Sequence, residues 1–291
     1  MPLWEGVLEK FGKVTLHNVA ERKTVMKEFG PQQAASGIDV MLEVLVRGMN
    51  ADEQMLIFRT HVNPTETTAL ALARSLPVKP VSNNIKERIM LLEDSPLRSF
   101  LERYVERRVA YHNAGLSVEE RRLVEHLFKE GVLQVLVTTA TLSAGVNLPA
   151  DKVVIADYRR FDPGRRTQVP IDVAEYKNCA GRAGRFGKRA EGVCLLLTTV
   201  PGQTRILERQ YIYGSPLALE SAIPSQPDLA RHVLGVVAEQ LANTASDVLA
   251  LFRDSLAFLT FYGPRGAGTE LDKAIESGIE RLLSLSSELR T

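Results

Sequence analysis

Short runs of apolar residues recur along the first two thirds of the chain, separated by polar turns and by segments with helical spacing. The runs lie at 54–59, 109–112, 132–137, 152–157 and 192–198. Continuous apolar runs of this length, bounded by turn residues, are typical of strands buried on both faces of a parallel sheet. The alternation of such strands with helices predicts an α/β fold with a parallel sheet.

Helix signals lie between these runs. Ile38–Arg47 carries apolar residues at helical spacing, and Asn63 with Pro64 and Glu66 predicts a helix start that runs to about Ser75. Ser117 followed by Glu120 predicts a capping box. Residues 77–108 are predicted to be mostly helical and are rich in charged residues, which favours a surface insertion. A short hairpin is expected around Gly12–Lys13.

The last part of the chain has a different pattern. Three amphipathic segments are predicted to be helices, at 228–241, at 245–258 and from Thr269 onward. Ser215–Pro216 precedes them and indicates a boundary. We therefore expect three parts: 1–50 as a linker and the start of the main domain, 51–213 as the main domain, and 214–291 as a small, mostly helical domain.

Two polar stretches suggest where chemistry occurs. The strand predicted at 132–137 leads into a run with Thr139, Thr141 and Gly145, at the position where open α/β sheets bind ligands. Farther on, Arg182 and Arg185 lie three residues apart in a Gly-Arg-Ala-Gly-Arg segment. That spacing places both guanidinium groups on one face of a helix or turn, and arginine binds phosphate bidentately. Together these stretches predict a phosphate-handling site, although a structural Gly-Arg repeat is the alternative.

The net charge of +1 predicts no general attraction to nucleic acid, but the charge is unevenly distributed. Between Lys152 and Arg189 there are ten Lys and Arg against four Asp and Glu. Such a stripe is the expected footprint of phosphate-backbone binding, or else a solvated charged face. Within it, Asp162-Pro163-Gly164 is a turn between two segments of Arg and β-forming residues, which predicts a basic hairpin.

The segment Thr139–Ala150 and the Gly-Arg-Ala-Gly-Arg segment resemble motifs V and VI of superfamily-two helicases. The similar branch is the Ski2-like one, of DEAD/DEAH-box type, with the archaeal repair helicases and the exosome-associated RNA helicases. The resemblance implies that residues 51–213 are the second RecA-like domain of a helicase motor, of the P-loop-NTPase type. It also implies that residues 214–291 are the beginning of a winged-helix domain.

The resemblance also implies an ATP site. Arg182 and Arg185 match the arginine fingers of motif VI, and Gly145, Asn147 and Asn178 match other positions that face the nucleotide. Asn178 departs from the family, which has glutamine there; the amide is kept but is one methylene shorter. ATP with Mg²⁺ would be bound jointly with a first RecA-like domain.

Nucleic-acid contacts follow from the same resemblance. They are expected at Thr60 after the strand at 54–59, at His112, at Thr139 and Thr141, and along the hairpin. For His112 a structural hydrogen bond is an equal alternative. In the resembled repair helicases the hairpin between motifs V and VI separates the duplex. Its candidate contacts here are Tyr158, Arg159, Phe161 and Arg165, with aromatic stacking on an unpaired base as one mode. A structural hairpin at the sheet edge is the alternative.

The sequence contains no Gly-x-x-x-x-Gly-Lys-Ser/Thr, and Asp52–Met55 precedes its strand, so it resembles a DExH box only superficially. We therefore expect no ATPase activity from this polypeptide alone. A P-loop and DExH domain would have to act in cis or in trans, on single-stranded or forked DNA or RNA. The chain would then be a helicase fragment or one part of a split enzyme. A non-catalytic nucleic-acid-binding module and a degenerate, helicase-derived interaction protein remain the alternatives.

Composition adds little beyond cellular context. The mean hydropathy of -0.06 is ordinary for a globular protein, and no apolar run approaches the length of about 20 residues that spans a membrane. Cys179 and Cys194 have no metal-type spacing. We expect a cytoplasmic protein with reduced thiols and no membrane partner.

Overall fold

The computed structural model describes residues 2–9, 12–30, 37–139, 148–184, 191–216, 221, 223–225 and 229–288. The chain forms two compact units, Met1–Leu217 and Ala218–Thr291. In the described part of the chain no helix is long and apolar enough to cross a membrane.

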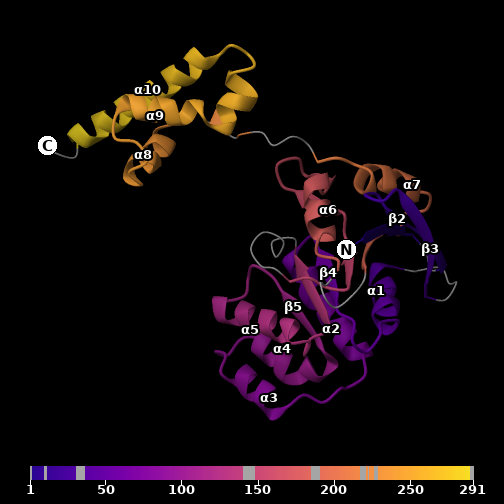
Figure 1. Ribbon diagram of the computed structural model, residues 1–291. Helices are drawn as coiled ribbons and strands as arrows, with labels where there is room; N and C mark the ends of the chain where they lie inside the picture. The colour runs from indigo at the N-terminus through magenta and orange to yellow at the C-terminus, as the bar shows by residue number, and fades with distance from the viewer. Residues whose placement is uncertain are drawn as a thin grey trace. The chain divides into compact units, whose positions relative to one another are not determined.

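Eight strands of the described residues form one sheet in the first unit, and two more form a separate hairpin (Figure 1). The sheet strands are β1 (Leu3–Leu8), β2 (Gly12–Asn18), β3 (Lys23–Phe29), β4 (Met55–Arg59), β5 (Val109–His112), β6 (Val135–Thr139), β7 (Lys152–Ile155) and β10 (Gly192–Leu197). Their order is β3-β2-β1-β10-β7-β4-β6-β5. From β1 to β5 in this order all neighbours are parallel, whereas β2 pairs antiparallel with both β1 and β3.

The helices of the first unit lie between these strands or follow the last of them. They are α1 (Ile38–Arg47), α2 (Val62–Ser75), α3 (Asn83–Met90), α4 (Pro96–Tyr104), a 3₁₀ turn at Val105–Arg107, α5 (Val118–Lys129), α6 (Val173–Ala180), α7 (Thr204–Leu207) and a π-helical turn at Glu208–Ile212. The predicted α/β fold with a parallel sheet is confirmed. The range predicted for the first helix agrees with α1, and Ser117 and Glu120 form the predicted capping box of α5.

Other boundaries differ from the sequence expectations. The strand predicted at 132–137 begins three residues later, because the backbone N–H of Leu133 bonds to Leu127 and that of Gln134 to Arg108 before β6 begins. Helix α2 begins at Val62, and its N-cap residue His61 accepts no capping bond with its side chain, so the predicted Asn63 cap is wrong. The hairpin expected near Gly12 is part of a larger unit: β1 also pairs along its length with β10.

The expected surface insertion at 77–108 is also wrong. Leu97 and Leu101 of α4 are fully buried, and the ring of Phe100 lies edge-on to that of Tyr111 in β5, with centroids 5.3 Å apart. Figure 1 shows α3, α4 and α5 gathered beside β5. The apolar side of α4 therefore covers the edge of the sheet, and only its charged side is exposed.

The second unit has its own core. Its helices are a 3₁₀ turn at Ile223–Ser225, α8 (Ala230–Ala238), α9 (Ala245–Arg253), a π-helical turn at Phe258–Tyr262 and α10 (Gly268–Glu288). Leu229, Val233, Val248, Phe252 and Leu271 are among its buried residues. A capping box between Thr244 and Asp247 begins α9. The three predicted helices are present, with α8 and α9 both shorter than expected.

Candidate functional site

Four parallel strands end at one edge of the sheet, and several candidate residues lie there. Arg59 at the end of β4 pairs with Thr139 at the end of β6, and His112 at the end of β5 pairs with Thr138. On the other side of β4, Phe58 pairs with Ile155, the last residue of β7. The structure therefore brings the ends of β4, β5, β6 and β7 together. We call this the carboxyl edge.

The predicted basic hairpin extends from this edge. It consists of β8 (Arg159–Asp162) and β9 (Thr167–Pro170), which pair antiparallel. The Asp162 carboxylate accepts bonds from the backbone N–H of Gly164 at 2.9 Å and of Arg165 at 3.1 Å, which fixes the turn. Arg159, Phe161 and Arg165 are exposed, with Phe161 at 48%. Two cations and an aromatic ring are therefore presented to the solvent.

The loop after β4 holds the base of this hairpin. Thr60 donates from Oγ1 to the carbonyl oxygen of Arg159 at 3.1 Å, and Nε2 of His61 accepts from the backbone N–H of Phe161 at 3.5 Å. Thr60 and Arg159, both candidate contacts, are thus neighbours. His61 has a structural partner in the hairpin.

A charged cluster beneath the hairpin was not anticipated from the sequence. Nε of Arg59 lies 2.8 Å from Asp157, and its Nη1 lies 3.2 Å from Asp39. Burial raises the pKa of the Asp157 carboxyl, and the Arg59 charge opposes that shift. The sequence does show opposite charges, Arg59 and Asp157, at the ends of two apolar runs. It does not show that β4 and β7 are neighbours in the sheet, which is what makes these two residues partners.

Two of the expected nucleic-acid contacts, His112 and Tyr158, have hydrogen-bond partners within the protein. The His112 side chain is 6% exposed and its Nε2 lies 3.2 Å from Glu125, so the structural alternative holds for its imidazole. Burial lowers the pKa of His112, and Glu125 opposes that shift. Tyr158 is half-buried and donates its hydroxyl to Gln203 at 2.6 Å, while its ring lies edge-on to Tyr211. The hydroxyl and part of the ring of Tyr158 are thus engaged within the protein. Thr139 is also buried.

The turn that carries Arg182 lies at the opposite edge of the sheet, which we call the amino edge. Helix α6 runs back from the hairpin, and the turn follows it. The backbone N–H of Ala150 donates to the carbonyl oxygen of Arg182 at 3.0 Å, and that of Gly184 donates to Ala150 at 2.6 Å. Ala150 precedes β7, so these bonds place the turn where β7 begins. We call residues 181–184 the arginine turn.

The arginine turn joins the two sequence motifs through the backbone. Ala150 ends the first motif, and its parallel bridge with Ala183 connects it to the second. Arg182 is half-buried, and burial lowers the pKa of its guanidinium because desolvation penalises the charge. Asn178 is exposed on the last turn of α6. Its link to a nucleotide stays a prediction.

The single phosphate site expected from the threonines and arginines is therefore not formed by the described residues. Thr139 lies at the carboxyl edge, whereas Arg182 lies at the amino edge, because α6 reverses the chain direction between the hairpin and the arginine turn. Thr141, Gly145, Asn147 and Arg185 lie outside the described residues.

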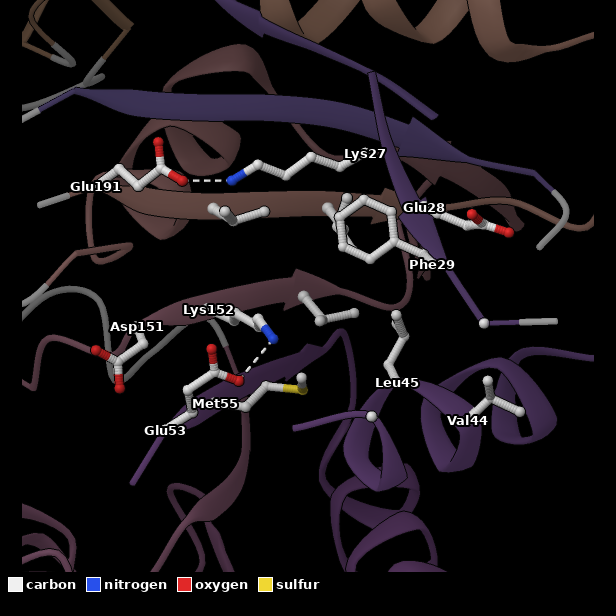
Figure 2. A pocket seen from close by; sticks show the side chains of 15 residues that line it. Lys27, Glu28, Phe29, Val44, Leu45, Glu53, Met55, Asp151, Lys152 and Glu191 are labelled. Atoms are coloured by element: carbon white, nitrogen blue, oxygen red, sulfur yellow. Dashed lines mark hydrogen bonds and ion pairs between the residues drawn. The ribbon is translucent and has the colours of Figure 1, made fainter. Parts of the chain in front are cut away.

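A pocket of about 490 Å³ lies beside the amino edge (Figure 2). Phe29, Leu45 and Met55 contribute apolar surface, and two ion pairs flank it, one between Lys152 and Glu53 at 2.7 Å and one between Lys27 and Glu191. Its charged lining residues are Lys27, Lys152, Glu28, Glu53, Asp151 and Glu191. Acidic groups outnumber basic ones, so the pocket is unsuited to the phosphates of a nucleotide.

The ion pair of Glu53 also bears on the DExH-like segment. Burial acts to raise the pKa of Glu53, but bonds from Lys152 and Asn50 outweigh it and hold that pKa below its ordinary value. The Glu53 carboxylate is therefore already paired with Lys152. Among the described residues, no group of three or more His, Cys, Asp or Glu side chains is placed to hold a metal ion.

Comparison with known proteins identifies relatives among the helicases. Residues 81–187 match the family described as the helicase conserved C-terminal domain. The chain is 37% identical over 224 residues to the ATP-dependent DNA helicase Hel308 of Pyrobaculum calidifontis, covering 75% of this chain and 31% of the relative. It is 32% identical over 263 residues to Hel308 of Caldivirga maquilingensis, covering 88% and 33%. For Hel308 of Methanocella arvoryzae the identity is 34% over 230 residues, covering 77% and 31%.

The chain thus spans about a third of the length of the curated relatives that it matches. The matched family covers α3 through the arginine turn, the region that holds both motifs and the hairpin. The chain belongs to the Ski2-like superfamily-two helicases and corresponds to the C-terminal half of their motor.

Proposed function

We propose that this chain supplies the second RecA-like domain of an ATP-dependent motor that separates DNA strands. The observation that carries the proposal is the placement of two elements on one rigid sheet. The arginine turn is fixed at the amino edge, and the basic hairpin is fixed at the carboxyl edge. The arginine turn suits the negative charge of a nucleotide, and the hairpin suits a nucleic-acid strand. A movement of the sheet would therefore displace both elements together.

The residues present fit part of an ATP site. Arg182 and, by sequence, Arg185 would stabilise negative charge on the phosphoryl group being transferred, as guanidinium groups do in related reactions. ATP with Mg²⁺ would supply the phosphoryl group and be held by a P-loop and DExH domain acting in cis or in trans. Gly145, Asn147 and Asn178 are proposed to face the same nucleotide.

The hairpin and the neighbouring loop would contact the nucleic acid. Arg159 and Arg165 are exposed cations suited to phosphates, and Phe161 is placed to stack on an unpaired base. Thr60, which already contacts the hairpin base, and Thr139 and Thr141 are proposed to contact the strand backbone. The DNA preference rests on the relatives, which are named as DNA helicases. The helices α8, α9 and α10 are proposed to be the beginning of a winged-helix domain, spanning residues 214–291.

Salt-dependent binding tests the role of the hairpin on this chain itself. The chain is expected to bind a fluorescent forked DNA with an affinity that falls steeply with salt. Arg165→Ala is expected to reduce the slope of log K against log salt by about 0.7 to 0.9, because one phosphate contact is lost. The measurement is fluorescence anisotropy over a series of salt concentrations.

Arg47→Ala is the matched control, since Arg47 is an exposed arginine at the end of α1, ion-paired with Glu43. It should leave the slope unchanged. An equal change in both variants, or none in either, would mean that the hairpin does not contact the DNA phosphates.

A further inference from the structure

The hairpin is held by helix α6 as well as by the loop after β4. Nη1 of Arg160, in β8, lies 2.9 Å from Oε2 of Glu175, in the first turn of α6. The Glu175 side chain is 16% exposed, against 47% for Arg160. Burial raises the pKa of Glu175, and the Arg160 charge opposes this. The carboxylate is thus mostly shielded from water and directed at the hairpin.

Only two residues connect the hairpin to α6. The first is Ile171, whose backbone N–H donates to the carbonyl oxygen of Tyr158 at 2.9 Å and so closes the hairpin base. The second is Asp172, which caps α6 by accepting from the backbone N–H of Glu175 at 2.7 Å. Both are engaged in hydrogen bonds, so the hairpin and α6 form a continuous element without a free linker.

The body of α6 is anchored in the domain. Tyr176 is fully buried, with its ring 5.1 Å from that of Tyr211, and Cys179 is buried. Nζ of Lys177 reaches Glu5 at 3.1 Å and the carbonyl oxygen of Ile212 at 2.7 Å. Beyond its last residue, the arginine turn is bonded to Ala150. The helix therefore joins a fixed arginine turn at one end to the hairpin at the other.

We infer that Glu175 is a positioning residue that couples the hairpin to the arginine turn through α6. It contacts neither nucleotide nor DNA. Its ion pair with Arg160 makes the hairpin a stiff extension of the sheet, so that a displacement driven at the arginine turn reaches the duplex. Without the pair, the hairpin can bend when the duplex resists. The inference rests on the proposed function.

The first test needs no motor activity. Hydrogen exchange of this chain is measured for wild type, Glu175→Arg, Arg160→Glu and the doubly substituted chain in which the charges are exchanged. Each single substitution places like charges together and is expected to speed exchange of the hairpin amides by about threefold, a change typical of one ion pair near the surface. The exchanged pair should restore slow exchange, and the amide of Gly184 should not change. Unchanged hairpin exchange in both single variants would overturn the inference.

The second test measures coupling in a motor formed with a P-loop-bearing first domain. Glu175→Arg is expected to keep ATP turnover within about twofold of wild type, while the base pairs separated per ATP fall severalfold. The loss should be larger on forks rich in G·C pairs, because they resist opening more, and the charge-exchanged pair should reverse it. Glu43→Gln, which breaks the surface pair of Glu43 with Arg47 in α1, should have no effect.

The outcomes separate the two claims. A wild-type motor that hydrolyses ATP but does not separate strands would contradict the proposed function, whatever the exchange data show. An active wild-type motor whose efficiency per ATP is unaffected by Glu175→Arg would overturn the coupling alone. A loss that is the same on all forks and follows a parallel fall in ATP turnover would also overturn it, because that pattern indicates general destabilisation.

Discussion

Replacing Arg182 by alanine is expected to lower ATP turnover by about 10³–10⁵-fold in a motor that contains this chain and a P-loop-bearing first domain. The reason is the position of Arg182 on a turn fixed to the start of β7 by two backbone bonds. In one bond the N–H of Ala150 donates to the carbonyl oxygen of Arg182, and in the other the N–H of Gly184 donates to the carbonyl oxygen of Ala150. Alanine keeps all of them, so the substitution removes the guanidinium and leaves the turn in place.

The measurement is the steady-state rate of ATP hydrolysis with saturating single-stranded DNA, together with the affinity for that strand. Strand affinity should be retained, since Arg182 and the hairpin lie at opposite edges of the sheet. Arg182→Lys is the matched variant: it keeps the charge but loses the planar, bidentate guanidinium, and should recover only part of the activity. Turnover by Arg182→Ala equal to that of wild type would remove Arg182 from the ATP site.

Replacing Gly192 by alanine is expected to displace the arginine turn from the sheet and to lower stability by about 1–3 kcal/mol. Gly192 begins β10. A Cβ atom there would lie 2.4 Å from the backbone carbon and oxygen of Ala183 and 2.6 Å from the nitrogen of Gly184. These contacts are all with backbone, so the turn must shift as a whole. ATP turnover in the motor should fall as well, because the shift moves Arg182.

Urea unfolding of the first unit gives the stability change, and the ATP hydrolysis assay gives the functional one. Gly37→Ala is the matched control in the same unit, since a Cβ at Gly37 would meet no atom within 4 Å and its backbone is extended. This control should be close to wild type in both assays. If Gly192→Ala is as stable and active as Gly37→Ala, the close packing of the arginine turn on β10 is not present in solution.

Short-range sequence patterns predicted which residues form helices and strands. Which of their surfaces are buried depends on long-range packing. Apolar spacing predicted the range of α1, and the Ser117–Glu120 pair predicted the capping box, because both depend on residues a few positions apart. Helix α4 was misread because it lies within residues 77–108, a segment rich in charged residues. Its burial depends on contact with β5, including the ring of Tyr111. Residues 96–104 contain no local sequence signal that predicts this contact.

The candidate site shows the same division. Residues at strand ends could be assigned to the carboxyl edge from the sequence, because parallel strands end on the same side of a sheet. The position of Arg182 could not, because it depends on α6 reversing direction and on the bridge between Ala150 and Ala183. The imidazole of His112 illustrates a further limit: its partner Glu125 lies in α5, on a face that the sequence alone does not identify.

The rate of ATP hydrolysis by this chain, alone and mixed with a P-loop-bearing first motor domain, tests the central claim most directly. Each rate is measured with and without single-stranded DNA. We expect no hydrolysis by the chain alone, and hydrolysis that is stimulated by the strand in the mixture. Hydrolysis by the chain alone, or a mixture that binds the strand but remains inactive, would contradict the proposal that this chain completes a helicase motor.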